Sequence, residues 1–159
     1  MSNSVVITSA VRTAVGSLGK SLKNVSGDSL GSSVITESIN KSQIKNDEID
    51  EVIMGQVLTG GAGQNPARQA AMKSGVPKEK PAYIVNQVCG SGLRSVASGF
   101  QSIKAGDSKI VIAGGQESMS LAPHAIHLRE GKKLGNTEMT DTMIKDGLWD
   151  AFHGYHMGV

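Results

Sequence analysis

The chain has 159 residues, and 38% of them are hydrophobic, which is enough to build the core of one domain of ordinary size. Its 16 basic and 14 acidic residues form no long run of either sign and aromatic residues are few, so the composition argues against a nucleic-acid partner. With one cysteine, no signal-peptide pattern and no apolar run near the roughly 20 residues that span a bilayer, we expect a soluble, cytoplasmic protein that binds no membrane.

The first third of the chain predicts a strand, a helix and a second strand. A β-branched run at residues 5–10 is typical of a buried strand. Residues 27–42 predict a helix capped by Asp28, with its apolar positions near one face at Leu30, Val34, Ile35 and Ile39. Residues 51–58 predict the second strand. The glycine-rich stretch that follows lacks the Gly-Lys-Ser/Thr ending of a phosphate loop, so we interpret it as a turn.

Residues 65–75 contain the residues that commonly begin and end a helix. Asn65 suits the N-cap, Pro66 suits the first helical position, and Gly75 suits the left-handed position just past the end. We therefore predict a helix here.

The next segment predicts two more strands around a helix. Residues 81–88 and 109–115 are strand-like, and residues 91–107 predict an amphipathic helix that stops at Gly106. The apolar positions of this helix are Leu93, Val96, Ala97, Phe100 and Ile103. Strands that are apolar on both faces and alternate with helices indicate an α/β fold with a mostly parallel sheet and helices on both faces.

The residue composition and its periodicity change after Ser118. Beyond it, methionine, histidine, glycine and charged residues are mixed without a strong period. We place a boundary there, with residues 1–118 as the α/β core and residues 119–159 as a second, loop-rich part.

The only cysteine, Cys89, lies in "NQVCGSGLRSV", between a predicted strand and a predicted helix. Open α/β sheets usually carry their sites at this edge, and a helix N-terminus stabilises a thiolate or an oxyanion. Cys89 is therefore a candidate nucleophile. A buried, inert cysteine is an equally common outcome, and the spacing alone leaves both readings open.

The four histidines raise the question of a metal site. They form two pairs at a spacing of three, His124 with His127 and His153 with His156. No carboxylate or second thiol completes a plausible ligand set, so we expect no metal.

Several segments, in order along the chain, resemble the thiolases, a family of acyl-CoA acyltransferases. "NQVCGSGLRSV" resembles their nucleophile segment, "SAVRTAVGSLGKSLKN" their N-terminal strand and loop, and "GQVLTGGAGQNPARQAAM" their second strand and following helix. "AGGQESMSLAPH" is similar to the strand that enters their loop domain, and "TDTMIKDGLWDAFHGYHMG" to the part of that domain beside the substrate channel. The resemblance implies the N-terminal half of a thiolase-like layered fold plus the start of a loop domain.

The resemblance also implies a mechanism. Cys89 would be acylated by a CoA thioester and pass the acyl group to a second acetyl-CoA, or run the reverse thiolysis, with its own N–H helping to hold the oxyanion. His156 and Met157 would line the pantetheine and acyl end of the channel, and Leu148 would lie against CoA. CoA thioesters would be substrates, and no cofactor is expected. The stretch "HLREGKKLGNTEMTDTMI" resembles a tetramerisation loop, which implies a homo-oligomer, a dimer or a tetramer, in a full-length protein and favours acetoacetyl-CoA chemistry.

One departure from the family is large. Its members are more than twice as long, and their second half supplies an activating histidine, a second cysteine and an oxyanion-hole asparagine. We therefore expect a truncated chain that does not catalyse condensation by itself. Two alternatives stay open, namely a catalytically inactive CoA-binding or interaction module and a fragment of another thiolase-like condensing enzyme.

Overall fold

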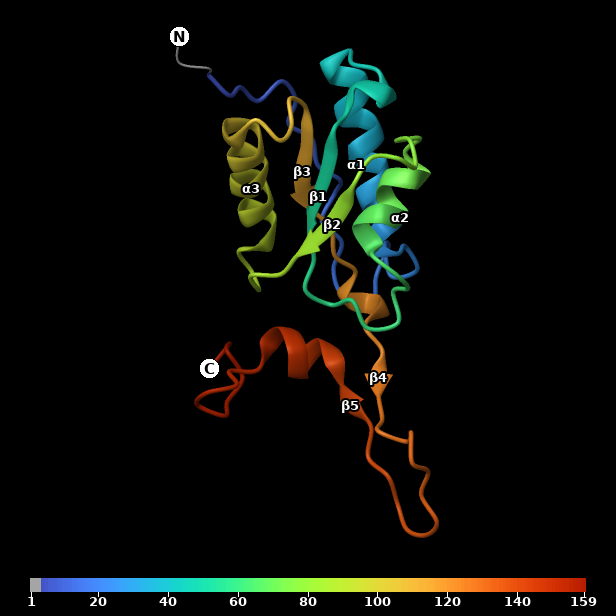
Figure 1. Cartoon of the computed structure of the whole chain (residues 1–159). Coiled ribbons are helices and arrows are strands. Elements are labelled where there is room, and N and C mark those ends of the chain that lie inside the picture. Colours follow the sequence, from blue (N-terminus) through green and yellow to red (C-terminus); the bar gives the residue numbers. More distant parts are fainter. Residues whose placement is uncertain (1–3) are drawn as a thin grey trace.

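The computed structural model describes residues 4–159 and contains a three-stranded parallel sheet (Figure 1). Its strands are β1 (Glu51–Gly55), β2 (Ala82–Val85) and β3 (Val111–Gly115). The spatial order is β2-β1-β3, and the strands keep a continuous register, with Met54 opposite Ile84 on one side and Gly114 on the other. The predicted second, third and fourth strands are confirmed, although each is shorter than expected.

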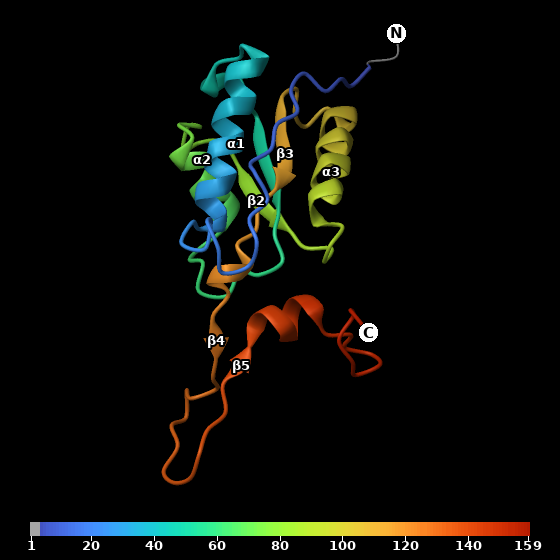
Figure 2. The same cartoon turned by 180° about the vertical axis from the view of Figure 1, so that it is seen from behind.

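Helices cover both faces of this sheet, as predicted. Helices α1 (Gly27–Ser42) and α2 (Pro66–Lys73) pack together on one face, and α3 (Ser91–Ala105) lies on the other (Figures 1 and 2). Asn65 caps α2 by accepting a hydrogen bond from the Arg68 N–H at 3.1 Å, and Pro66 is the first helical residue. Gly106 ends α3 in the left-handed conformation with φ +87°. The predicted boundaries of α2 and α3 are therefore confirmed.

The N-terminal cap predicted for α1 is wrong. Ser26 occupies the N-cap position, and Asp28 lies in the first turn. The Asp28 carboxylate pairs with Lys73 of α2. Burial alone would raise the pKa of Asp28, but the ammonium group and the Ser26 hydroxyl lower it below its ordinary value. A tertiary partner has thus replaced a local one.

The main hydrophobic core lies between the sheet and helices α1 and α2. Alternate residues of β1 point into it, as the pleat of a strand requires. The buried members of this core are Ile35, Ile39, Ile49, Val52, Met54, Ala67, Ala70, Ala71 and Val76. The alanines of α2 let that helix pack closely on its neighbours.

Helix α3 turns a face of small residues to the sheet. Ser91, Ser95 and Gly99 are its buried residues, and the Ser95 hydroxyl donates to the Gly114 carbonyl of β3 at 2.7 Å. The apolar stripe of the predicted amphipathic helix lies elsewhere, with Leu93 78% exposed and Phe100 49% exposed. Close backbone approach, rather than burial of large side chains, attaches α3 to the sheet.

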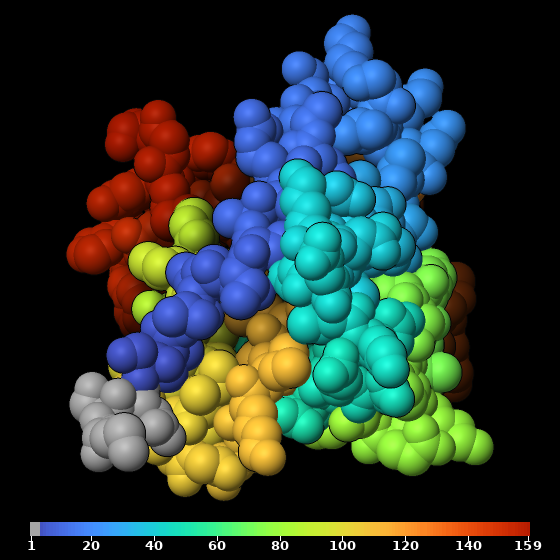
Figure 3. Space-filling view, turned by 90° about the horizontal axis from the view of Figure 1, so that it is seen from above, coloured from blue at the N-terminus to red at the C-terminus, as the bar shows by residue number. Residues whose placement is uncertain are grey.

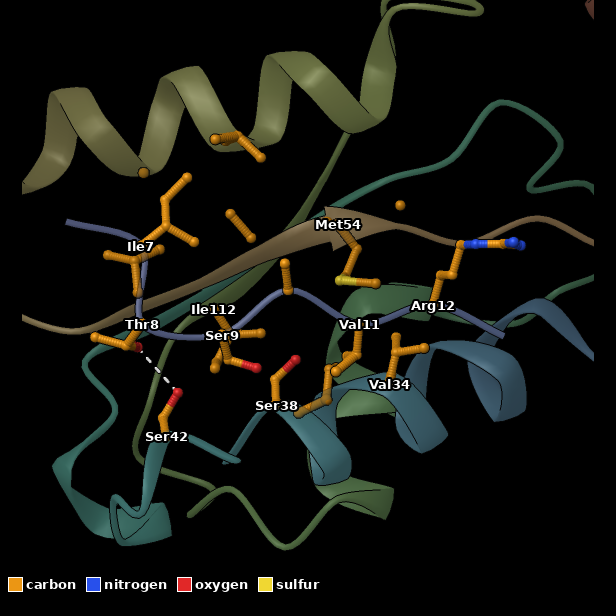
Figure 4. Close-up of a pocket in the computed structure, with 18 of the residues that line it drawn as sticks. Ile7, Thr8, Ser9, Val11, Arg12, Val34, Ser38, Ser42, Met54 and Ile112 are labelled. Carbon is orange, nitrogen blue, oxygen red and sulfur yellow. Dashed lines mark hydrogen bonds between the residues drawn. The ribbon is translucent and has the colours of Figure 1, made fainter. Parts of the chain in front are cut away.

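The strand predicted at residues 5–10 does not form. Residues 4–17 contain no helix or strand, and the segment runs along the surface between α1 and the β3–α3 layer (Figure 3). A cavity of about 640 Å³ separates it from β3 and α3, and Met54, Ile112 and Val34 are among the side chains around it (Figure 4). Without a neighbouring backbone within reach, the β-branched residues have no ladder to join, so propensity alone does not make a strand.

The remaining elements are short. They are the 3₁₀ turns η1 (Asn46–Glu48) and η2 (Met119–Leu121), the antiparallel pair β4 (His124–Ala125) and β5 (Thr140–Asp141), and the π-helix η3 (Met143–Leu148). The loop between β4 and β5 extends away from the rest of the molecule (Figure 1). The boundary predicted near Ser118 stays a prediction. Within residues 4–159, no helix has both the length and the apolar character needed to cross a bilayer.

Candidate active site

Cys89 lies in the short loop that joins the carboxyl end of β2 to the first turn of α3. Its thiol is exposed and unpaired. The three parallel strands end on this side of the sheet, so the loops that follow them converge there. The placement predicted for Cys89 is therefore seen in the structure, whereas its chemical role stays a prediction.

Glycines at the ends of two strands allow the first turn of α3 to lie directly on the sheet. A Cβ atom added to Gly55 would clash with the Ser91 carbonyl carbon and lie 2.5 Å from the Gly92 nitrogen. One added to Gly115 would lie 3.3 Å from the Gly92 Cα. The sequence analysis did not single out these glycines, although a glycine at the end of an apolar strand is a recognisable sign of close backbone approach.

Hydrogen bonds from neighbouring side chains fix the loop that carries Cys89. Asn86 Oδ1 accepts from the Val88 N–H at 2.9 Å. The Ser91 hydroxyl accepts from the Gln87 N–H at 2.9 Å and donates to the Val88 carbonyl at 2.6 Å. No side chain caps the N-terminus of α3, so its partial positive charge is directed toward the loop. This arrangement can stabilise a negatively charged sulfur or oxygen.

A polar layer joins the loops that follow β1 and β3. The Glu117 carboxylate accepts from the Val57 and Leu58 N–H groups at 2.9 and 3.2 Å. Beside it, Gln116 Nε2 donates to Gln56 Oε1 at 2.9 Å. Both loops are thereby fixed at the edge of the sheet from which Cys89 projects.

The three residues predicted to contact substrate lie together in one small hairpin near the C-terminus. The Met157 N–H donates to the Leu148 carbonyl at 2.9 Å, and Trp149 is bridged to His156 in antiparallel fashion. Leu148 and His156 are partly buried, and the Met157 side chain is 48% exposed. The structure therefore groups Leu148, His156 and Met157, as a shared binding role requires.

Asp150 stabilises the turn of this hairpin. Its carboxylate contacts the His153 ring nitrogen at 2.9 Å and accepts from the N–H groups of His153 and Phe152. The ring contact and these two backbone hydrogen bonds lower the pKa of Asp150 below its ordinary value. His153 is thus engaged within the turn, which gives it a structural role.

The hairpin and the Cys89 loop are on the same side of the α/β core. In Figure 1 the C-terminal segment lies below the loop between β2 and α3, and Figure 3 shows the two segments next to each other from a perpendicular direction. The sequence places them about 60 residues apart. The fold therefore brings the candidate nucleophile and the predicted substrate-binding residues to a common region.

The histidines do not assemble a metal centre. His124 Nε2 lies 3.9 Å from the Asp141 carboxylate, in the β4–β5 pair, and His153 is held by Asp150. In the part of the chain that the structure describes, no group of three or more potential ligands gathers at one point.

Comparison with known proteins identifies the family. Residues 5–159 match the model of the thiolase N-terminal domain, which is nearly the whole chain. The chain belongs to the thiolase family. Cys89 and the hairpin are accordingly parts of a thiolase N-terminal domain.

Individual thiolases are similar to the chain in sequence and in structure. It is 58% identical to the acetyl-CoA acetyltransferase of Rhizobium meliloti (strain 1021) and 50% identical to the cytosolic acetyl-CoA acetyltransferase of Rattus norvegicus, over 100% and 99% of its length. The crystal structure of the Bacillus anthracis acetyl-CoA acetyltransferase superposes with a TM-score of 0.91 over 96% of the chain, at 36% identity. The match covers 41%, 40% and 39% of those proteins, respectively, so the chain is a partial, N-terminal thiolase.

Proposed function

We propose that this chain is the nucleophile-bearing part of an acetyl-CoA acetyltransferase and that Cys89 accepts the acyl group. One observation carries the proposal, namely an exposed cysteine held at the uncapped N-terminus of α3, at the carboxyl end of a parallel sheet, in a thiolase domain. The names of the similar proteins, acetyl-CoA acetyltransferases, favour acetyl-CoA as the acyl donor.

The proposed step is a thioester exchange. The Cys89 sulfur attacks the carbonyl carbon of the thioester, the bond from that carbon to the CoA sulfur breaks, and the proton of the cysteine leaves with CoA as its thiol. The bonds formed and broken are of the same kind, so the reaction is close to balanced in energy. Backbone N–H groups of the Cys89 loop and of the first turn of α3 would stabilise the oxyanion.

The C-terminal hairpin would bind the rest of the donor. Leu148 and Met157 offer apolar surface suited to the pantetheine arm, and His156 offers a ring nitrogen. The other ring nitrogen, Nδ1, accepts from the Gly158 N–H at 2.9 Å, which fixes the orientation of the ring and leaves Nε2 for the substrate. We propose that these side chains hold the thioester end of the substrate toward Cys89.

Condensation needs groups that this chain does not contain. The resemblance assigns the second cysteine to the other half of the family's sequence, and this chain has one cysteine. A missing general base costs about 10²–10⁴ in rate. We therefore propose that the 159-residue chain takes up an acetyl group but forms no acetoacetyl-CoA, and that assembly into a homo-oligomer belongs to the complete enzyme.

The test is the intact mass of the chain after incubation with acetyl-CoA. We expect one added acetyl group, removed by hydroxylamine as a thioester is, and no acetoacetyl-CoA in the solution. The matched control is Cys89→Ala, which leaves no thiol in the chain. CoA binding without any acetylation of the wild-type chain would instead support a binding module and contradict the proposal.

A further inference from the structure

In the loop that carries Cys89, Val88 has a backbone conformation that valine disfavours. Val88 has φ +49°, in the left-handed region, where a β-branched side chain is a rare outlier. Packing does not explain it, because the Val88 side chain is 46% exposed. The conformation must therefore be held by hydrogen bonds to the backbone on either side of Val88.

Two side chains supply that hold. Asn86 Oδ1 binds the Val88 N–H, and the Ser91 hydroxyl binds the Val88 carbonyl and the Gln87 N–H. The backbone adds to this hold, because the Ser91 N–H also donates to the Val88 carbonyl at 3.1 Å. Ser91 thus fixes the peptide that joins Val88 to Cys89, whereas Asn86 fixes the peptide that precedes Val88. Together they determine the rotation of the chain immediately before the thiol.

Ser91 is itself anchored to the sheet. It is the first residue of α3, is only 4% exposed, and its backbone lies against Gly55 at the end of β1. A hydroxyl has a single proton to donate, and that of Ser91 goes to the Val88 carbonyl. Ser91 therefore acts on the backbone and donates no hydrogen bond to the sulfur.

We infer that Ser91 is a positioning residue for Cys89. Its hydroxyl holds Val88 in the left-handed conformation and so directs the thiol relative to the N-terminus of α3. This inference rests on the proposed function, in which Cys89 accepts the acyl group. Without the hydroxyl, the Val88 carbonyl keeps only its bond from the Ser91 N–H and the Gln87 N–H loses its acceptor. We expect Val88 then to relax toward negative φ and Cys89 to move away from the N–H groups that would stabilise the reaction.

The test is a double-mutant cycle of Ser91→Ala and Val88→Gly in the full chain. Because Cys89 is the only thiol, the rate of its alkylation by iodoacetamide can be followed from intact mass, beside the rate of acetylation by acetyl-CoA. We expect Ser91→Ala to slow both rates by about tenfold, the scale of a small misplacement of a reacting group. Adding Val88→Gly should recover most of that loss, because glycine adopts positive φ without strain.

Ser95→Ala is the matched control. It removes a second buried hydroxyl of the same helix face, one that binds the Gly92 and Gly114 carbonyls and no residue of the loop at 86–90. Its rates should stay near those of the wild type. Should Ser91→Ala fail to fold, Asn86→Ala, at an exposed residue, removes the other hydrogen bond to Val88 and should show the same recovery with Val88→Gly.

The two readouts separate the two proposals. Wild-type rates in Ser91→Ala, or a loss that Val88→Gly does not recover, would overturn the positioning role. Alkylation of the wild-type chain without any acetylation would overturn the proposed function, and the role of Ser91 would still be decided by the alkylation rates.

Discussion

Gly55 and Gly92 meet backbone to backbone where β1 ends and α3 begins, with no room for a Cβ atom on Gly55. We expect Gly55→Ala to push the first turn of α3 off the sheet and to destabilise the fold by about 1–3 kcal/mol, the usual cost of overpacking. Because Cys89 lies immediately before this turn, its alkylation should also slow. Urea unfolding and the alkylation rate measure the two effects.

Gly114→Ala is the matched control for that substitution. Gly114 is also a strand glycine, but a Cβ atom there would make only ordinary contact with the Met54 side chain at 3.8 Å. We expect near wild-type stability and reactivity. Equal effects of the two substitutions would contradict the close approach of α3 to β1.

The stability of the fold should depend on the ionisation of Asp50. The N–H groups of Lys109 and Ile110 donate to its carboxylate and lower its pKa in the folded state. A lowered folded pKa means that the stabilisation is complete above the unfolded value, near pH 4, and is lost as the pH falls through the folded value. The free energy of unfolding should therefore fall as the pH drops below about 4.

Asp50→Asn tests this dependence, because asparagine keeps an acceptor but not the charge. We expect it to lower the free energy of unfolding by about 1 kcal/mol at pH 7 and to change it less at pH 3. The measurement is a series of urea titrations between these two pH values. If the free energy of unfolding of the wild type and of the variant changed equally with pH, the charge of Asp50 would not contribute to stability.

The C-terminal hairpin gives a prediction for substrate binding. Met157→Ala removes apolar surface beside Leu148 and should raise the dissociation constant for acetyl-CoA by about three- to tenfold. Phe152→Ala is the control, because the Phe152 side chain lies in the same turn but is 95% exposed. Isothermal titration calorimetry with the Cys89→Ala background avoids turnover. A larger effect at Phe152 than at Met157 would place the substrate on the other side of the hairpin.

The loop between β4 and β5 gives a prediction for self-association. It projects from the molecule and exposes large apolar side chains, with Leu134 at 89% and Met139 at 59%. Its sequence resembles a tetramerisation loop. In the complete enzyme, we expect Leu134→Ser with Met139→Ser to shift the light-scattering mass toward the monomer while leaving the circular dichroism unchanged, because neither residue contributes to the core. An unchanged mass would remove the loop from the interface.

Much of the fold could be predicted from local sequence signals. The ends of α2 follow from Asn65, Pro66 and Gly75, each of which acts within a few residues, and the end of α3 follows from Gly106. The error at residues 5–10 has a different origin, because a strand exists only when another backbone lies beside it. The cap assigned to Asp28 failed because Lys73, 45 residues away, provides a stronger partner.

The candidate site was predictable in position but not in construction. Cys89 could be placed at the end of the sheet from the strand–helix order around it. The left-handed conformation of Val88 could not be predicted, because a β-branched residue is the opposite of the usual signal for positive φ. A glycine at the end of an apolar strand indicates close backbone approach at Gly55. Its partner Ser91 is 36 residues away and is placed there by the packing of α3, so no local signal identifies that partner.

The N-terminal segment has a consequence for the dynamics of the chain. Residues 5–13 line the cavity beside β3. Residues 4–16 nevertheless make no backbone–backbone hydrogen bond with another residue that the structure describes, and the Thr8 and Ser42 hydroxyls, 2.9 Å apart, connect the segment to α1. Amide protons in this segment should therefore exchange with deuterium almost as fast as in an unfolded peptide, whereas those of β1 should exchange only through global opening. The segment thus has a defined place in the fold without the amide hydrogen bonds that would slow its exchange.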